Sequence, residues 1–250
     1  MGTKYRLCSE ADIYHVTTRG VAQQIIFEDD NDREFFLSRM RFYVDECEVH
    51  LLAWCLMSNH IHLLVQAELE KTRTFMHKLL ASYAIHFNNR HRRSGHLFQG
   101  RFDSVPIETD EQLMTAMRYI HRNPLSIPGQ SLETYCLSSY REYLGQPFIT
   151  EVSYIMRLFN GMDEFVAFHD AWDPSDESEL RAKRARQKVS DENAIEFAKQ
   201  LLRIDSIGII ASSDKPTRNR YLATLKRHGL PVQQVSRITG LGRNIVQRAH

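Results

Sequence analysis

Two short apolar stretches separated by only two residues constrain the fold of this chain more than any other feature. "VHLLAWCLM" (49–57) and "HIHLLVQ" (60–66) are joined by Ser58-Asn59. Two apolar runs of strand length with a two-residue connection predict an antiparallel β-hairpin. A third strand is expected over 12–20, because "DIYHVTTRG" is rich in β-branched and aromatic residues and stops at a glycine.

Helical patterns flank this hairpin on both sides. Residues 29–47 begin with capping residues and continue with large apolar residues at helical spacing. A second helix is predicted over 72–91, with the inward-facing residues Phe75, Leu79, Tyr83, Ile85 and Phe87. An extended segment (96–108) and a helix (109–124) follow. The order β-α-β-β-α-β predicts an α+β fold of the ferredoxin-like type, an antiparallel sheet with helices on one face, and leaves the other face for the added helix.

The rest of the chain divides by composition. We expect one domain over 1–150, a helical connector and polar linker over 151–190, and a small all-helical unit over 191–250. In this last unit "PVQQVSRITG" and "LGRNIVQRAH" meet at Gly240. Two short helices around a glycine-containing turn, the second of them basic, predict a helix-turn-helix that binds DNA.

The net charge of +1 hides an uneven distribution of charged residues. No Asp or Glu occurs between Lys71 and Phe102 or between Lys215 and His250, although both segments are rich in Lys and Arg. Such segregation predicts two basic surfaces for nucleic-acid phosphates, because solvated helix faces, the alternative, normally mix the two signs. The expected DNA contacts are arginines of these segments: Arg90, Arg92, Arg93, Arg101, Arg237 and Arg243.

The four cysteines lack CxxC spacing and predict reduced thiols. The first 16 residues contain no apolar signal-peptide core, and no stretch approaches the roughly 20 apolar residues that span a bilayer. With 42% hydrophobic and 25% charged residues, the composition is that of a soluble globular protein. We therefore expect a cytoplasmic protein without a membrane partner.

Two histidines interrupt the apolar strand over 60–66. Residues two apart on a strand share a face, so His60 and His62 lie about 7 Å apart and can converge on a metal ion. On the helix over 109–124, Tyr119 and Asn123 are four apart and share a face near the edge of its apolar stripe. The structural alternative is a pair of surface or hydrogen-bonded histidines, a packing tyrosine and an asparagine that ends a helix before Pro124.

Three motifs together resemble a known family. "CLMSNHIHLLV", "GHLFQGRF" and "RYIHRNPL" occur in the order found in single-tyrosine HUH transposases, where U is the hydrophobic residue between the histidines. The resemblance is to the IS200-like and REP-associated tyrosine transposases and covers roughly residues 10–130. Ser58 stands where the family often has Pro, and Arg122 stands where an apolar residue is common. Neither position carries chemistry.

The resemblance implies a reaction and a substrate. A divalent ion, Mg²⁺ or Mn²⁺, held by His60, His62 and Asn123 would polarise the scissile phosphate. Tyr119 would then attack, which gives a 5′-phosphotyrosine link and a free 3′-OH. The family acts on single-stranded DNA folded into hairpins. Insertion-sequence members are dimers that exchange the tyrosine helix, whereas the REP-associated branch can act as monomers; the long tail here favours a monomer and leaves a homodimer open.

Other functional classes are less consistent with the sequence. The main alternative is a catalytically silent, sequence-specific DNA-binding regulator on the same fold, but a pure binder needs neither the histidine pair nor Tyr119 and Asn123. A structural zinc protein is disfavoured because no cysteines stand at ligand spacing. A relaxase or rolling-circle initiator shares the chemistry, but here the histidine pair precedes the tyrosine and no second nucleophilic tyrosine lies nearby.

Overall fold

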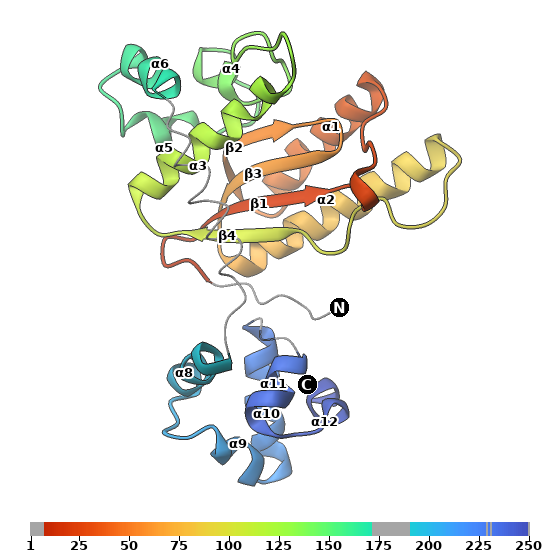
Figure 1. Ribbon diagram of the computed structural model, residues 1–250, viewed down its shortest axis with the longest axis vertical. Coiled ribbons are helices and arrows are strands. Elements are labelled where there is room, and N and C mark those ends of the chain that lie inside the picture. Colours follow the sequence, from red (N-terminus) through yellow and green to blue (C-terminus); the bar gives the residue numbers. More distant parts are fainter. Residues whose placement is uncertain (1–7, 172–190, 229, 231, 250) are drawn as a thin grey trace. The chain divides into compact units, whose positions relative to one another are not determined.

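The computed structural model describes residues 8–171, 191–228, 230 and 232–249. These residues fall into two compact units, 9–171 and 191–249, which are described separately (Figure 1). The polar linker predicted within 151–190 lies mostly outside the described residues. Within the described part of the chain, no helix is both long and apolar enough to cross a membrane.

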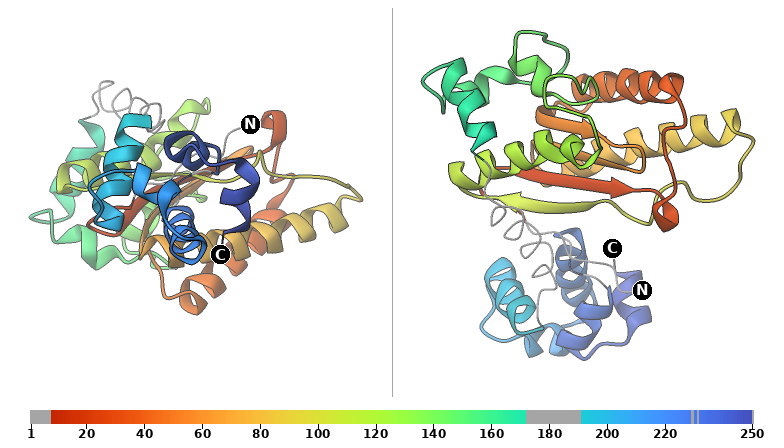
Figure 2. Two further views of the ribbon diagram at one scale, coloured as in Figure 1. Left: turned by 90° about the horizontal axis from the view of Figure 1, so that it is seen from below. Right: turned by 45° about the horizontal axis from the view of Figure 1, so that its top comes forward.

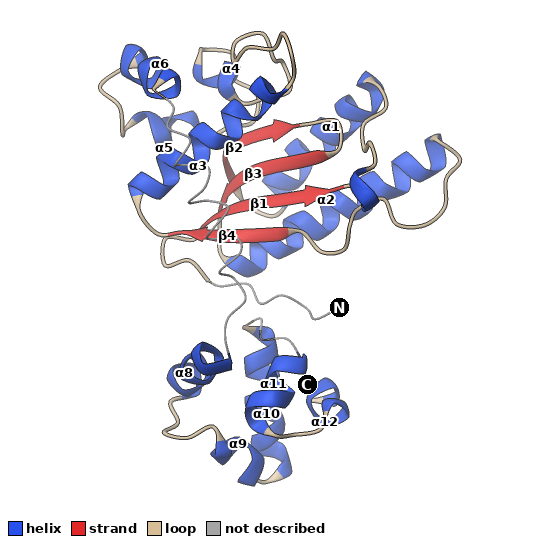
Figure 3. Ribbon diagram, viewed as in Figure 1, coloured by secondary structure: helices blue, strands red, loops and turns tan. Residues whose placement is uncertain are grey.

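The first unit is built on a four-stranded sheet, which is drawn in red in Figure 3. Its strands are β1 (Ile13–Arg19), β2 (His50–Leu56), β3 (His60–Gln66) and β4 (Asp103–Ile107). They lie in the order β2-β3-β1-β4, and every neighbouring pair is antiparallel. This is the ferredoxin-like sheet that the sequence predicted. The hairpin closes as predicted, because Met57 N donates to His60 O at 2.9 Å around Ser58 and Asn59.

Helices α1 (Asp30–Glu46) and α2 (Leu69–Arg90) cover one face of this sheet (Figure 2). The Asp29 side chain caps α1 by accepting a hydrogen bond from Asp32 N. Together with the sheet the two helices bury a large apolar core, which includes Tyr14, Ile61, Leu63, Val65, Phe36, Met40, Phe75, Leu79, Tyr83 and Phe87. Ile85 was expected to face this core but is 63% exposed. Each residue of a helix turns about 100°, so Ile85 points away from both Tyr83 and Phe87.

Helix α3 (Asp110–Arg122) lies on the opposite face of the sheet. The Thr109 side chain caps it at Gln112 N, and the short 3-10 helix η2 (Asn123–Ser126) follows its end. A further 3-10 helix, η1 (Val21–Gln23), follows β1. The predicted helical connector consists of two helices, α5 (Val152–Met156) and α6 (Met162–Asp170), interrupted at Gly161 with φ +141°. Both pack with α3 and α4 (Tyr140–Tyr143) into a second core.

The second unit is all-helical, as predicted. It contains α8 (Asp191–Leu202), α9 (Gly208–Ser212), α10 (Lys215–Arg227), α11 (Val232–Thr239) and α12 (Arg243–Arg248). Small and branched apolar side chains form its core: Ala194, Ala198, Ile210, Leu222, Leu225, Val235, Ile238 and Val246. Gly240, with φ +71°, lies in the turn between α11 and α12. The positive φ explains why this turn carries glycine.

Gly20 joins three segments at the end of β1 and tolerates no side chain. Its N–H donates to Asn59 O at 2.9 Å, and it forms an isolated bridge with Phe98. Its φ of −63° suits any residue, but an added Cβ would overlap Gln24 O and lie 2.9 Å from Ile26 Cγ2. We therefore expect Gly20→Ala to lower the free energy of unfolding by about 1–3 kcal/mol in denaturant titrations. Gly208→Ala is the control, because its Cβ would meet nothing closer than Ser206 Oγ at 3.6 Å; an equal loss in both variants would contradict this reading.

Candidate active site

Three histidines gather on the sheet face that α3 covers. His60 and His62 lie on β3 with ring centroids 5.0 Å apart. His15 on β1 joins them, with its Nε2 3.0 Å from His62 Nδ1. His15 is 0% and His62 2% exposed, whereas His60 is half-buried. The sequence analysis missed His15, because its approach to His62 depends on the register between two strands 47 residues apart.

Helix α3 brings Tyr119 to these imidazoles. The centroid of its ring lies 5.4 Å from that of His62 and 5.7 Å from that of His15, both in edge-on geometry. Tyr119 is half-buried, unlike its fully buried neighbour Ile120. The phenol thus lies at the margin of the packed face, as the helical spacing predicted.

Asn123 lies directly after α3, one turn beyond Tyr119. Its Nδ2 donates to Tyr119 O at 2.8 Å, which orients the amide. The side chain is half-buried. With the nitrogen used on the helix end, Oδ1 is the atom of this amide that has the chemistry of a metal ligand.

The donor chemistry of the histidines suits a divalent ion. His60 Nδ1 lies 2.7 Å from Asn59 Oδ1, and since an amide oxygen only accepts, Nδ1 carries the proton and Nε2 the lone pair. Among the described residues, no group of three or more His, Cys, Asp and Glu could hold a metal. A three-ligand site that includes His60 and His62 would need a donor of another type, such as the amide oxygen of Asn123. A site of two imidazole nitrogens and one amide oxygen would suit Mn²⁺ better than Mg²⁺, because Mg²⁺ prefers ligands that are all oxygen.

Two arginines attach α3 to the end of α6. Arg118 Nη1 donates to Phe168 O at 3.0 Å and Ala171 O at 2.8 Å, and Arg122 Nη1 donates to His169 O at 2.6 Å. Carbonyls at a helix C-terminus lack partners within the helix and attract cations. The position of Tyr119 on α3 is thus set by hydrogen bonds as well as by apolar packing.

A buried hydrogen-bond chain adds to this attachment. His169 Nδ1 donates to Phe165 O at 2.8 Å, which leaves its Nε2 to accept from His121 Nδ1 at 2.9 Å. His121 Nε2 then accepts from Ser139 Oγ at 2.8 Å. A serine hydrogen-bonded to a histidine, which is itself hydrogen-bonded to a third polar group (here His169), resembles a nucleophilic triad. However, all three side chains are 0% exposed, so they are inaccessible to a substrate and their role is structural.

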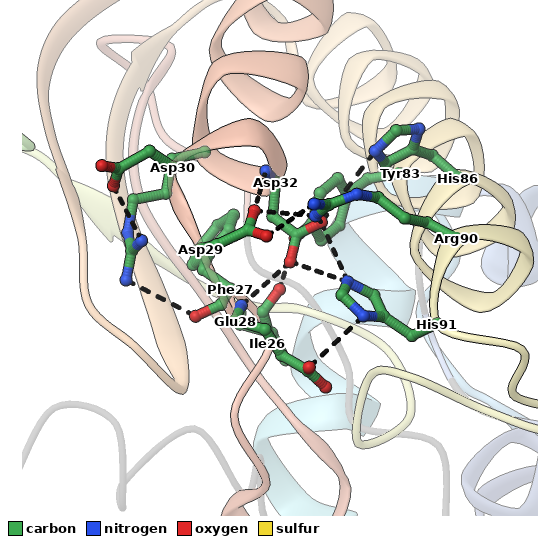
Figure 4. Close-up of polar contacts among 11 residues, drawn as sticks. Ile26, Phe27, Glu28, Asp29, Asp30, Asp32, Tyr83, His86, Arg90 and His91 are labelled. Atoms are coloured by element: carbon green, nitrogen blue, oxygen red, sulfur yellow. Dashed lines mark hydrogen bonds and ion pairs between the residues drawn. The ribbon is translucent and has the colours of Figure 1, made fainter.

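Figure 4 shows where the first predicted DNA contact, Arg90, lies. Its guanidinium binds Asp29 at 2.5 Å and Asp32 at 2.7 Å, and His91 binds Asp32 at 3.0 Å. Burial raises the pKa of Asp32, but hydrogen bonds from Glu28 N–H, His91 and Arg90 outweigh this and hold that pKa below its ordinary value. Arg90 therefore ties the end of α2 to the start of α1.

The other predicted arginines differ in their partners. Arg93 donates to Gln24 Oε1 at 2.5 Å and lies over the Phe87 ring, while Arg92 and Arg101 are exposed. In the second unit Arg237 makes two hydrogen bonds to Asp191, at 2.8 and 2.9 Å. Arg243 is exposed at the start of α12.

The sequence analysis also missed Arg19, the last residue of β1. It pairs in register with His60, and residues opposite each other on antiparallel strands project from the same face. Arg19 is exposed, and its guanidinium has no acidic partner among the described residues. The side chain of Arg19 thus leaves β1 opposite His60, from the face that carries the histidines.

Comparisons with known proteins identify what this arrangement is similar to. Residues 8–123 match the family described as "Transposase IS200 like", which confirms the resemblance seen in the motifs. The solved structure of a REP-associated tyrosine transposase bound to a REP hairpin has a TM-score of 0.50 and 12% identity, and the match covers 61% of this chain and 93% of that chain. This likeness shows a shared fold. A candidate transposase from Deinococcus radiodurans R1 matches with a TM-score of 0.33 and 15% identity, over 40% of this chain and 82% of that one. No curated protein matches the sequence.

The buried histidines on α3 and α6 make stability depend on pH. Burial lowers the pKa of His169 to about 4 from 6.5, and burial beside His169 lowers that of His121. Between pH 6.5 and about pH 4, His169 is protonated in the unfolded chain but stays neutral in the folded protein. The free energy of unfolding therefore falls as the pH falls through this range. We expect a slope of about 1.4 kcal/mol per pH unit from His169 in urea titrations. His169→Asn should flatten the profile, and an unchanged slope would contradict this explanation.

Proposed function

We propose, from the match of residues 8–123 to the IS200-like transposases, that this chain cleaves and rejoins single-stranded hairpin DNA through a 5′-phosphotyrosine intermediate. The observation that carries the proposal is the placement of the Tyr119 ring 5.4 Å from that of His62, with His60 beside it. A phenol next to two potential metal ligands can act as a nucleophile toward a phosphodiester.

The reaction forms one bond and breaks one. Tyr119 Oη bonds to the scissile phosphorus while the P–O3′ bond breaks, and the hydroxyl hydrogen ends on the released 3′-oxygen. Because the phosphotyrosine ester conserves the bond, a 3′-OH can later attack it and rejoin the strand without a nucleotide triphosphate. A divalent ion held by His60, His62 and Asn123 would supply Lewis-acid stabilisation of the charge on the phosphate. Asn123 also fixes the end of α3, through its hydrogen bond to Tyr119 O.

The substrate class is supported by charge and by the structural neighbour, which is bound to a REP hairpin. Arg19, in register with His60, is the arginine best placed to contact a phosphate next to the cleaved bond. The exposed Arg92, Arg101 and Arg243 would contact other phosphates of the DNA. A phosphate contact by Arg90 or Arg237 would have to compete with the carboxylates that each already binds.

We propose further that one chain assembles a complete site. The hydrogen bonds from Arg118 and Arg122 hold α3 on α6 of the same chain. The second core also buries α3 against its own sheet. Exchange of the tyrosine helix between two copies would have to replace both sets of contacts by the same contacts between chains.

Tyr119→Phe removes the nucleophilic oxygen and keeps the ring. We expect it to abolish the covalent adduct with a 3′-labelled hairpin DNA in Mn²⁺, because it removes the oxygen that is proposed to form the ester. A 5′ label should instead mark the released fragment that ends in a 3′-OH, and this product should also disappear. DNA affinity without cleavage should not change. Tyr154→Phe, on α5, is the matched control and should retain the adduct. Adduct formation by Tyr119→Phe would contradict the assignment of the nucleophile, whereas a wild-type protein that forms no adduct would favour the DNA-binding regulator.

His62→Ala removes one proposed ligand. We expect it to lose cleavage together with the stimulation by Mn²⁺, whereas Mn²⁺ stimulation equal to that of the wild type would exclude this histidine as a ligand. Mixing His62→Ala with Tyr119→Phe tests the proposed monomer, because each chain lacks a different part of the site. A site within one chain predicts no activity in the mixture, whereas restored adduct formation would show that the tyrosine helix is exchanged.

A further inference from the structure

We propose that His15 is a positioning residue that holds the His62 ring in the tautomer and orientation needed to bind a divalent ion. This inference rests on the metal-dependent cleavage proposed above. It concerns a residue that none of the three motifs contains.

The contact between the two rings is direct and closed to solvent. His15 Nε2 and His62 Nδ1 lie 3.0 Å apart, and the two residues are 0% and 2% exposed. In the sheet, Thr17 is opposite His62 and His15 is opposite Leu64, so the two histidines are diagonal neighbours on one face. At this burial a ring nitrogen without a partner would be unfavourable.

The direction of this hydrogen bond decides whether His62 can bind a metal. A neutral imidazole carries its proton on one nitrogen only. If His62 Nδ1–H donates to His15 Nε2, the lone pair of His62 lies on its other nitrogen, Nε2, which does not face His15. If His15 donates instead, the proton of His62 moves to Nε2 and coordination through that atom is lost. Metal binding therefore requires His15 to accept.

The second proposed ligand shows the same arrangement. His60 Nδ1 donates to Asn59 Oδ1 at 2.7 Å, so each ring of the pair has a partner at Nδ1. Hydrogen bonds of this kind orient metal-binding histidines in proteins, and their loss commonly weakens metal binding about 10- to 100-fold. The ring of His15 also lies 5.7 Å from that of Tyr119, so it supports the ligand and the nucleophile together.

The experiment compares Mn²⁺ binding to full-length variants by electron paramagnetic resonance. His15→Phe fills the space but accepts no hydrogen bond, and we expect its Mn²⁺ affinity to fall about 10- to 100-fold. His15→Gln places an amide oxygen near the position of Nε2 and should restore most of the affinity. His77→Phe, an exposed position on α2, is the matched control and should bind Mn²⁺ like the wild type. Equal affinities of His15→Phe and wild type would overturn the inference alone, whereas a wild type that binds no Mn²⁺ would overturn the proposed metal site with it.

A second measurement needs no substitution. Nitrogen-15 NMR of the wild-type protein loaded with diamagnetic Zn²⁺ reports which nitrogen of His62 carries the proton. The inference predicts a protonated Nδ1 bonded to His15. A proton on Nε2 of His62 in the loaded protein would overturn it, even if His15→Phe failed to fold.

Discussion

The antiparallel pairing of β1 with β3 is the constraint on which the candidate site depends. Its register brings His15, His60 and His62 out on the sheet face that α3 covers. The residues between them on β3, Ile61 and Leu63, fill the core under α1 and α2. Because side chains alternate along a strand, a shift of one residue would exchange the two sets and bury the imidazoles in that core. The apolar pattern that stabilises the sheet therefore also determines which face carries the histidines.

Helix α3 requires directional contacts as well as apolar ones. An apolar interface permits small rotations, whereas hydrogen bonds to fixed carbonyls do not. The bonds of Arg118, His121 and Arg122 reach residues 47 to 53 positions later in the chain. The segment that supplies these partners contains no candidate catalytic residue, yet it orients Tyr119. This is a physical reason for the chain to continue beyond α3 in the same compact unit.

Local patterns were sufficient to predict the elements but not the contacts between them. Strand alternation and helical spacing placed His60, His62 and Tyr119 on the correct elements and faces, while their catalytic roles stay predictions. Nothing in the sequence around His15 indicates that it meets His62, because strand register is a property of the folded sheet. Arg90 appeared available for DNA in a segment without acids, but its carboxylate partners come from residues 58 and 61 positions earlier. Acids distant in sequence likewise account for Arg237, which binds Asp191.

Burial, rather than the residue type, distinguishes two of the histidine clusters in the first unit. In both clusters the imidazoles supply hydrogen-bond partners for one another, because a buried imidazole is tolerated only when its nitrogens have partners. In the cluster of His121 and His169, a carbonyl closes one end and Ser139 the other, and every member is fully buried. In the cluster of His15 and His62, the row ends at His60 and Tyr119, which are both half-buried. Of these two rows, a phosphate could approach only the second, so hydrogen bonds of the same kind serve cohesion in the first cluster and are proposed to serve chemistry in the second.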